Sequence, residues 1–256
     1  MGNAFRRKGD LDAAVRCYRK ALQIQPGSAA LYYNIGNALL IKGEFESAIR
    51  NFKSALRIDP NNSEAWNNKG DALRVQGKLN AAIESYDKTI EISPDHMDAR
   101  YNRSLLVLNL EDFKTGWPTY EYRWKKSKLD SAPTVTRRPK WRLGDQGRVL
   151  VWGEQGIGDE VMFASLIRDL HTVCSHLIVK ADLRLIPILR RSFPRGIEFY
   201  ANGETVPEDD YDAHIAIGSL PMHFRPNINS FKIAAQGYLL AYIAKAAALR
   251  LCGTNC

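Results

Sequence analysis

A glycine-rich segment with acidic and amide side chains is the part of this sequence best suited to chemistry. It reads Gly153-Glu154-Gln155-Gly156-Ile157-Gly158-Asp159 and follows the apolar run 148–152, which predicts a short buried strand. In such a turn, backbone N–H groups and the start of the next helix point outward and can hold a polar ligand. The segment therefore predicts a loop that binds a polar ligand or a phosphate. Its members are Gly153, Glu154, Gln155, Gly156 and Gly158.

The spacing of these glycines argues against two common nucleotide sites. It is G-x-x-G-x-G, which differs from the G-x-G-x-x-G dinucleotide fingerprint, and no G-K-[ST] ending follows it. A classical NAD site and a P-loop are therefore disfavoured. Cys252 and Cys256 have no histidine nearby, so we interpret them as incidental rather than as metal ligands. The sequence predicts no metal site and no cofactor.

The elements that position this loop follow from the apolar pattern of residues 148–256. Apolar runs predict strands at 148–152, 176–180, 196–201 and 213–217, and amphipathic runs predict helices at 161–170 and 184–192. Strands that alternate with helices favour a parallel, Rossmann-like sheet.

The first half of the chain has a different organisation, a repeat of 34 residues. Four columns of equivalent residues share this period. They are Gly2, Gly36 and Gly70; Ala14, Ala48 and Ala82; Tyr18, Phe52 and Tyr86; and Pro26, Pro60 and Pro94. Four independent columns with one spacing indicate a structural repeat rather than chance.

Each repeat is predicted to be a pair of antiparallel helices. Gly36 lies where the two helices approach closely, and Phe52 fills the gap toward the neighbouring repeat. Gly43 ends the first helix in a left-handed conformation, and Pro60 ends the second. The same residues recur one period later. A fourth unit, 97–130, keeps only part of the pattern, as expected of a repeat that caps a stack.

These columns resemble the tetratricopeptide (TPR) repeat. The resemblance implies a helical solenoid whose first helices line a groove for a peptide or a partner protein. Polar side chains on those helices are our candidates for a peptide-binding groove, and ordinary solvated helix surface is the alternative. The candidates are Asn34, Asn37, Asn67, Asn68 and Asp71.

A second resemblance covers the other half. The segments 141–144, 149–160 and 212–221, directly after TPR repeats, resemble a bacterial TPR protein with a glycosyltransferase-like domain. The domain is similar to the first lobe of heptosyltransferase-type (family 9) enzymes of the GT-B fold. In those enzymes an aspartate after glycine in this loop is the general base, and Asp159 is the matching residue. The alternative is that Asp159 only caps the following helix. The resemblance also implies that the loop over 153–158 is the acceptor side of the site.

The expected fold class is α plus α/β: a TPR solenoid followed by a Rossmann-like parallel lobe, an incomplete GT-B. We expect repeats over 1–130 with the first one truncated, a basic linker over 131–147, and the lobe over 148–256. A GT-B enzyme needs a second, donor-binding lobe, and 148–256 has room for only one lobe of ordinary size. We therefore expect a fragment that catalyses no transfer by itself.

Three functions follow. The first is a TPR interaction module fused to part of a sugar-nucleotide-dependent hexosyl- or heptosyltransferase, with the repeats recruiting the acceptor. The second is a non-catalytic TPR scaffold, and the third is a nucleotide-binding regulator that uses the Gly153–Asp159 loop. The expected partner is a peptide or protein, with sugar nucleotide bound only if the second lobe is present.

Composition narrows the setting. The net charge of +8 is concentrated near the predicted linker, yet no nucleic-acid-binding motif accompanies it, so no nucleic acid partner is expected. The start MGNAFRRKGD lacks an apolar signal region, and charged and polar residues interrupt the longest apolar stretch, 233–251. We therefore expect no membrane span and a cytoplasmic location.

Overall fold

The computed structural model describes residues 1–125, 134–154, 156–234 and 238–239. The chain forms two compact units. The first contains Met1–Leu110 and the described residues from Thr119 to Lys125. The second contains Glu111–Pro118 and the described residues from Thr134 onward. The boundary at 130 and the linker limits 131–147 stay predictions.

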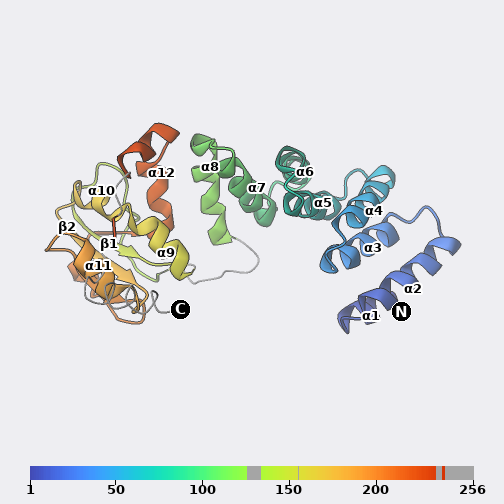
Figure 1. Ribbon diagram of the computed structural model, residues 1–256, viewed down its shortest axis with the longest axis horizontal. Coiled ribbons are helices and arrows are strands. Elements are labelled where there is room, and N and C mark those ends of the chain that lie inside the picture. Colours follow the sequence, from blue (N-terminus) through green and yellow to red (C-terminus); the bar gives the residue numbers. More distant parts are fainter. Residues whose placement is uncertain (126–133, 155, 235–237, 240–256) are drawn as a thin grey trace, which may run out of the picture. The chain divides into compact units, whose positions relative to one another are not determined.

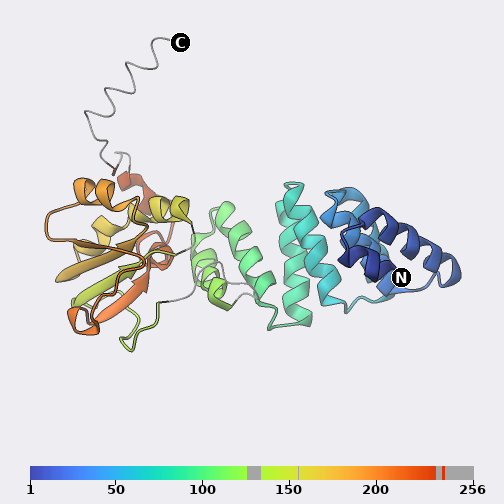
Figure 2. The ribbon, with the colours of Figure 1, turned by 90° about the horizontal axis from the view of Figure 1, so that it is seen from below.

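The first unit is a row of antiparallel helix pairs (Figures 1 and 2). Its pairs are α1 (Gly2–Arg7) with α2 (Leu11–Ile24), α3 (Ala29–Ile41) with α4 (Phe45–Ile58), and α5 (Ser63–Val75) with α6 (Leu79–Ile92). They are followed by α7 (Met97–Asn109) and the 3-10 turn η1 (Glu121–Lys125), while most of α8 (Phe113–Tyr120) belongs to the second unit. The predicted repeats are confirmed as helix pairs. The second helices α4 and α6 end two residues before Pro60 and Pro94, as proline requires.

The glycine column of the repeat is explained by close packing. A Cβ added to Gly36 would lie 2.6 Å from the ring of Phe52, and one added to Gly70 would lie 2.7 Å from the ring of Tyr86. Both rings are fully buried. The close approach that the sequence predicts is therefore confirmed, but the aromatic ring packs first on the glycine of its own repeat rather than only between repeats.

The turn inside each helix pair uses one backbone conformation. Gly9, Gly43 and Gly77 have φ values of 82°, 79° and 71°. One period later Glu111 adopts the same left-handed conformation, with φ 63°, and it is the only non-glycine residue with positive φ in the described part of the chain. A side chain with a Cβ is strained there by about 1 kcal/mol. The fourth repeat therefore keeps the turn without the residue that favours it.

The second unit is built on a parallel sheet. Its strands are β1 (Arg148–Trp152), β2 (His176–Ala181), β3 (Glu198–Ala201) and β4 (Ala213–Ala216), in the order β3-β2-β1-β4. Its helices are α9 (Ile157–Ala164), α10 (Ile167–His171), α11 (Ile186–Ser192) and α12 (Leu220–Phe224), with 3-10 turns η2 (Glu208–Asp210), η3 (Ile217–Ser219) and η4 (Ile228–Ala234). The predicted α/β class is confirmed.

The two faces of this sheet are covered differently. Val149 and Val151 of β1 pack in the large core with residues of α9 to α12, such as Phe163 and Leu189. Leu150 faces the other way and packs with Ile178, Val206 and Tyr211. Val206 and Tyr211 belong to the connection from β3 to β4, so this connection rather than a helix covers the second face.

The predicted strands agree closely with the observed ones, and the helix after the loop does not. β1 has the predicted bounds, while the helix predicted at 161–170 begins at Ile157 and is interrupted at Ser165 and Leu166. Its start is at the glycines because Gly156 takes the N-cap position in an extended conformation. The loop is therefore shorter, and Asp159 lies inside the first turn of α9.

Candidate functional site

The predicted groove residues join neighbouring repeats through side-chain hydrogen bonds. Asn68 of α5 donates from Nδ2 to Asn37 Oδ1 of α3 at 2.6 Å, and more weakly to the hydroxyl of Tyr33 at 3.4 Å. One repeat later, Asn102 of α7 donates from Nδ2 to Asp71 Oδ1 at 3.2 Å. We call Asn37, Asn68, Asp71 and Asn102 the amide ladder. It fixes the first helices of the second, third and fourth repeats side by side.

Burial makes Asp71 the electrostatically unusual member of the ladder. Desolvation holds the pKa of this carboxyl above its usual range, opposed by the hydrogen bond that the Tyr86 hydroxyl donates to Oδ1 at 2.7 Å. Burial, and then the charge of Asp71, raise the pKa of the Tyr86 phenol. The first repeat has the same arrangement, because Tyr18 donates to Asn3 Oδ1 at 2.6 Å. The third repeat thus couples an aromatic hydroxyl to a carboxylate.

The other two predicted groove residues have different surroundings. Asn67 is 7 % exposed and donates to Asn68 Oδ1 at 3.2 Å, while its own Oδ1 is buried without a hydrogen-bond partner. Asn34 is half-buried. Asn102 belongs to the ladder but is absent from the predicted set. Asn102 lies one repeat after Asn68, so the 34-residue spacing could have indicated it. The fourth unit, however, keeps only part of the repeat pattern.

In the second unit, the loop after β1 lies where the strand order changes direction. β1 pairs with β2 on one side and with β4 on the other: the chain passes from β1 through β2 to β3 and then crosses back to β4 on the far side of β1. Ligands of such sheets bind outside the carboxyl ends of the strands at this point. Glu154, directly after β1, is 3 % exposed and accepts a hydrogen bond from the backbone N–H of Gly218, after β4, at 3.0 Å. It ties the two loops together.

A second buried carboxylate, Glu160, joins α9 to the segments that follow β2 and β3. Its Oε2 accepts from the backbone N–H of Asp182 after β2 at 2.7 Å, and its Oε1 accepts from Asn202 Nδ2 after β3 at 2.9 Å. A Cβ on Gly153 would clash with this carboxylate. Gly153 is therefore needed for the close approach of Glu160, and its role in binding a ligand stays a prediction. Glu160 is not among the predicted site residues, because its hydrogen-bond partners Asp182 and Asn202 are distant in the sequence.

Asp159 is half-buried in the first turn of α9. Its Oδ2 accepts from the backbone N–H of Gly156 at 3.3 Å, so it caps the helix from the third helical position rather than from the N-cap itself. Gly156 and Gly158 are exposed beside it. Gln155 lies outside the described residues. The structure thus brings Asp159, Gly156 and Gly158 together at the open end of the sheet, with Glu154 buried behind them.

The charges around this loop bear on what it can hold. Two buried carboxylates lie at the edge of the sheet where a phosphate would bind, and Glu154 already uses the N–H group of Gly218. A nearby negative charge raises the cost of placing an anion there. A phosphate bound at this loop would therefore lie near two buried carboxyl groups.

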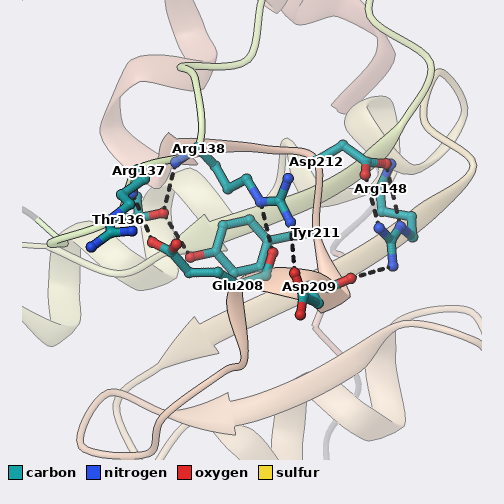
Figure 3. Close-up of polar contacts among 8 residues, drawn as sticks. All are labelled: Thr136, Arg137, Arg138, Arg148, Glu208, Asp209, Tyr211 and Asp212. Atoms are coloured by element: carbon teal, nitrogen blue, oxygen red, sulfur yellow. Dashed lines mark hydrogen bonds and ion pairs between the residues drawn. The ribbon is translucent and has the colours of Figure 1, made fainter.

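The basic segment before β1 is partly neutralised within the second unit (Figure 3). Arg138 donates to Asp209 Oδ1 at 3.1 Å, and the backbone N–H of Arg137 donates to Glu208 Oε1 at 2.7 Å. Arg148 pairs with Asp212 at 2.8 Å, and its guanidinium holds the pKa of that carboxyl at about 2. These contacts neutralise the charges of Arg138 and Arg148, and the predicted lack of a nucleic acid partner stays a prediction.

Neither a metal centre nor a membrane-spanning helix is present in the part of the chain that the structure describes. Among these residues no group of three or more His, Cys, Asp or Glu side chains could hold a metal ion. No helix formed by them is long and apolar enough to cross a bilayer. Cys252 and Cys256 lie outside the described residues.

Comparison with known families identifies the repeats. A model described as TPR repeat matches residues 2–40, and a tetratricopeptide repeat model matches residues 33–96 and 67–115. The N-terminal part of this chain therefore consists of TPR repeats. The two models together end at residue 115, before the first strand of the α/β unit.

Individual relatives match about half of the chain. Protein FlbA of Caulobacter vibrioides is 28 % identical over an alignment of 150 positions, which covers 52 % of this chain and 25 % of that protein. The chain thus spans about a quarter of the length of this relative. The crystal structure of MamA protein is 26 % identical and covers 48 % of this chain and 67 % of its own, with a TM-score of 0.46. The second TPR domain of human RPAP3, solved with an HSP70 peptide, is 27 % identical and covers 41 % of this chain and 88 % of its own, with a TM-score of 0.40.

Proposed function

We propose that the TPR repeats of this chain bind an extended segment of a partner protein along the face formed by α3, α5 and α7. The observation that carries this proposal is the amide ladder. It holds the first helices of three successive repeats together and lines them with amide and carboxylate groups. Side chains of this kind can pair with the N–H and C=O groups of an extended backbone. Because the ladder itself is already hydrogen-bonded, the half-buried Asn34 is the amide best placed to contact a ligand.

The experiment uses the purified chain and a phage-displayed library of random dodecapeptides. Peptides selected on the chain are synthesised, and their affinities are measured for Asn34→Arg and for Gln23→Arg, which makes the same change on the exposed surface of α2. We expect Asn34→Arg to weaken binding about tenfold, because a long charged side chain replaces an amide on the ligand-binding face. Gln23→Arg leaves binding within about twofold, as for a residue outside the interface. Equal affinities for the two variants, or a failure to select any peptide, would contradict the proposal.

A second function is proposed for the α/β unit: it is the acceptor-binding lobe of a glycosyltransferase. In support, the sheet is parallel, the loop after β1 lies at the change in strand order, and Asp159 is half-buried there beside exposed glycines. The buried carboxylates behind the loop suit a neutral sugar hydroxyl. The repeats would then recruit the protein or glycan that carries this hydroxyl.

In the proposed reaction the acceptor oxygen bonds to the sugar carbon of a sugar nucleotide as the bond from that carbon to the phosphate oxygen breaks. The acceptor proton goes to the carboxylate of Asp159. The nucleotide would be held by a second lobe. Glu154, Gly153, Gly156 and Gly158 would shape the acceptor side, and Gln155 completes the loop in sequence.

The test requires a protein that carries both lobes. Asp159→Asn is expected to lower turnover by about 10²-fold or more, the usual contribution of a general base, while the weakened helix cap costs no more than about 1 kcal/mol of stability. Asp210→Asn, on the exposed turn η2, is the matched control and keeps full turnover. Turnover of Asp159→Asn equal to that of the control would refute the base assignment.

The nucleotide-binding regulator remains the competing function for this loop. It predicts that the present chain binds a nucleoside diphosphate by itself and that Gly156→Val abolishes binding. We expect no heat of binding when UDP is titrated into the chain, because Glu154 already accepts the backbone N–H of Gly218 that could otherwise bind a phosphate.

A further inference from the structure

An unusual pair of lysines lies between the second and third repeats. Lys69 of α5 is half-buried, and its ammonium group lies over the ring of Trp66, 3.9 Å from the ring centre. Its nearest charged neighbours are the exposed Lys53 of α4 and the exposed Glu84 of α6. Within the described part of the chain neither lysine forms a hydrogen bond or an ion pair, so the repulsion between the two cations is opposed only by the charge of Glu84.

The repeat supplies its own comparison for this pair. One period after Lys53 is Asp87, and one period after Lys69 is Arg103. Arg103 Nε and Asp87 Oδ1 form an ion pair of 2.5 Å across the boundary between the third and fourth repeats. At the same place in the fold, therefore, one boundary pairs a cation with a carboxylate and the preceding boundary presents two cations.

The local environment is costly for the charge on Lys69. Burial, and then the charge of Lys53, lower the pKa of Lys69 to about 8, while Glu84 opposes this shift. One period earlier the same position is Ile35, which is 1 % exposed, so the backbone there accepts an apolar residue. A lysine at this position therefore places a cation where an apolar side chain would fit. The free-energy cost of burying its charge falls when an anion approaches both ammonium groups.

We propose that Lys53 and Lys69, with the face of Trp66, form a subsite that receives a carboxylate side chain of a partner protein, in the place that Asp87 occupies one repeat later. The Trp66 ring adds an apolar wall and a cation–π contact that holds Lys69 in position. This subsite lies at a boundary between repeats and includes the second helix α4. It does not depend on the first-helix face proposed above for peptide binding.

The probe is hexaglutamate, with hexaglutamine as the uncharged control and inorganic phosphate as the free anion. Binding is followed by NMR through the side-chain signals of the lysines. We expect hexaglutamate to shift the signals of Lys69 and to raise its pKa, whereas hexaglutamine leaves both unchanged. Phosphate at equal concentration is expected to produce a much smaller shift, since the subsite is built for a carboxylate on a chain.

The decisive variant is Lys53→Asp, which supplies an internal carboxylate as Asp87 does. It is expected to raise the pKa of Lys69 and to weaken hexaglutamate binding by about fivefold or more, the effect of losing one ion pair. Lys20→Asp, on the exposed surface of α2, changes the net charge by the same amount and is expected to alter affinity less than about twofold. Lys69→Met removes the second cation and is expected to match the loss in Lys53→Asp.

Three results would overturn the proposal. Equal losses in Lys53→Asp and Lys20→Asp would show that hexaglutamate senses only net charge. Unchanged binding by Lys69→Met would remove Lys69 from the site. Phosphate that competes with hexaglutamate at equal concentration would make this a free-anion site rather than one for a protein carboxylate.

Discussion

The repeat unit and the α/β unit are held together by contacts of different range. In the repeats, Gly36 packs on Phe52 and Asn68 bonds Asn37, so each contact joins residues within about one period. In the α/β unit, Glu154 reaches Gly218, and Trp152 donates to His214 Nδ1 at 3.1 Å, across more than sixty residues. A sequence repeat therefore predicts contacts between residues about one repeat apart. It does not predict the contacts of buried carboxylates that join strand ends distant in the sequence.

The repeats also contain their own variation. The same backbone positions are occupied by Lys53 and Lys69 at one boundary and by Asp87 and Arg103 at the next. Equivalent positions in neighbouring repeats therefore show how different side chains behave in similar surroundings. The α/β unit has no repeat and so gives no such comparison.

The largest effect is expected from overpacking the repeat. Gly70→Leu places a branched side chain where even a Cβ would lie 2.7 Å from the buried Tyr86 ring. We expect a loss of about 3 kcal/mol or more in the free energy of unfolding, measured by urea denaturation of the helical circular dichroism signal. Gly27→Ala, where nothing lies within 4 Å of an added Cβ, is the control and is expected to change stability by less than about 0.5 kcal/mol. Similar losses in both variants would mean that the glycine column does not mark close packing.

A smaller effect is expected in the α/β unit, from one buried carboxylate. Glu160→Gln keeps the shape but turns an NH₂ group toward a backbone N–H or toward Asn202. The expected cost is about 2 kcal/mol, that of losing a hydrogen bond to a charged group. Fluorescence of Trp141 and Trp152, both buried in this unit, reports its unfolding.

The control for this prediction is Glu198→Gln, which removes an exposed carboxylate paired with His176 at 2.9 Å. Its cost is expected to be below about 1 kcal/mol, as for other surface pairs. If Glu160→Gln were as stable as this control, the junction of β1, β2 and β3 would not depend on a buried charge, and the contrast between the two units would weaken.

The sequence predicts the repeat unit nearly to the residue, because each of its features is local. Gly43 and Gly77 end their helices in the left-handed conformation as expected, and Pro60 and Pro94 follow the second helices. The amide ladder was only half visible: Asn37, Asn68 and Asp71 were candidates for their place on the first helices. Their bonds to each other depend on how neighbouring repeats rotate, which no single helix determines.

For the α/β unit the sequence predicts the strands but not the loop. Apolar runs define β1 to β4 because buried parallel strands need them. The roles of Glu154 and Glu160 depend on which strand ends lie next to each other. The apolar pattern of each strand does not determine the order of the strands in the sheet. Asp159 remains a predicted base, now placed in the first turn of α9 with its carboxylate on Gly156 N–H.

The smallest effect tests the one turn that departs from its repeat. Glu111 has φ 63° where Gly9, Gly43 and Gly77 stand in the other repeats. Glu111→Gly is expected to increase the free energy of unfolding by about 1 kcal/mol, because glycine adopts this conformation without a clash of its Cβ. Glu111→Ala is the matched control: it keeps the Cβ, so it is expected to leave stability within about 0.5 kcal/mol of the original. Equal gains from glycine and alanine would mean that the Glu111 carboxylate destabilises the fourth repeat and that the backbone conformation does not. A gain from glycine alone would show that the last repeat keeps the backbone of the others after losing the residue that favours it.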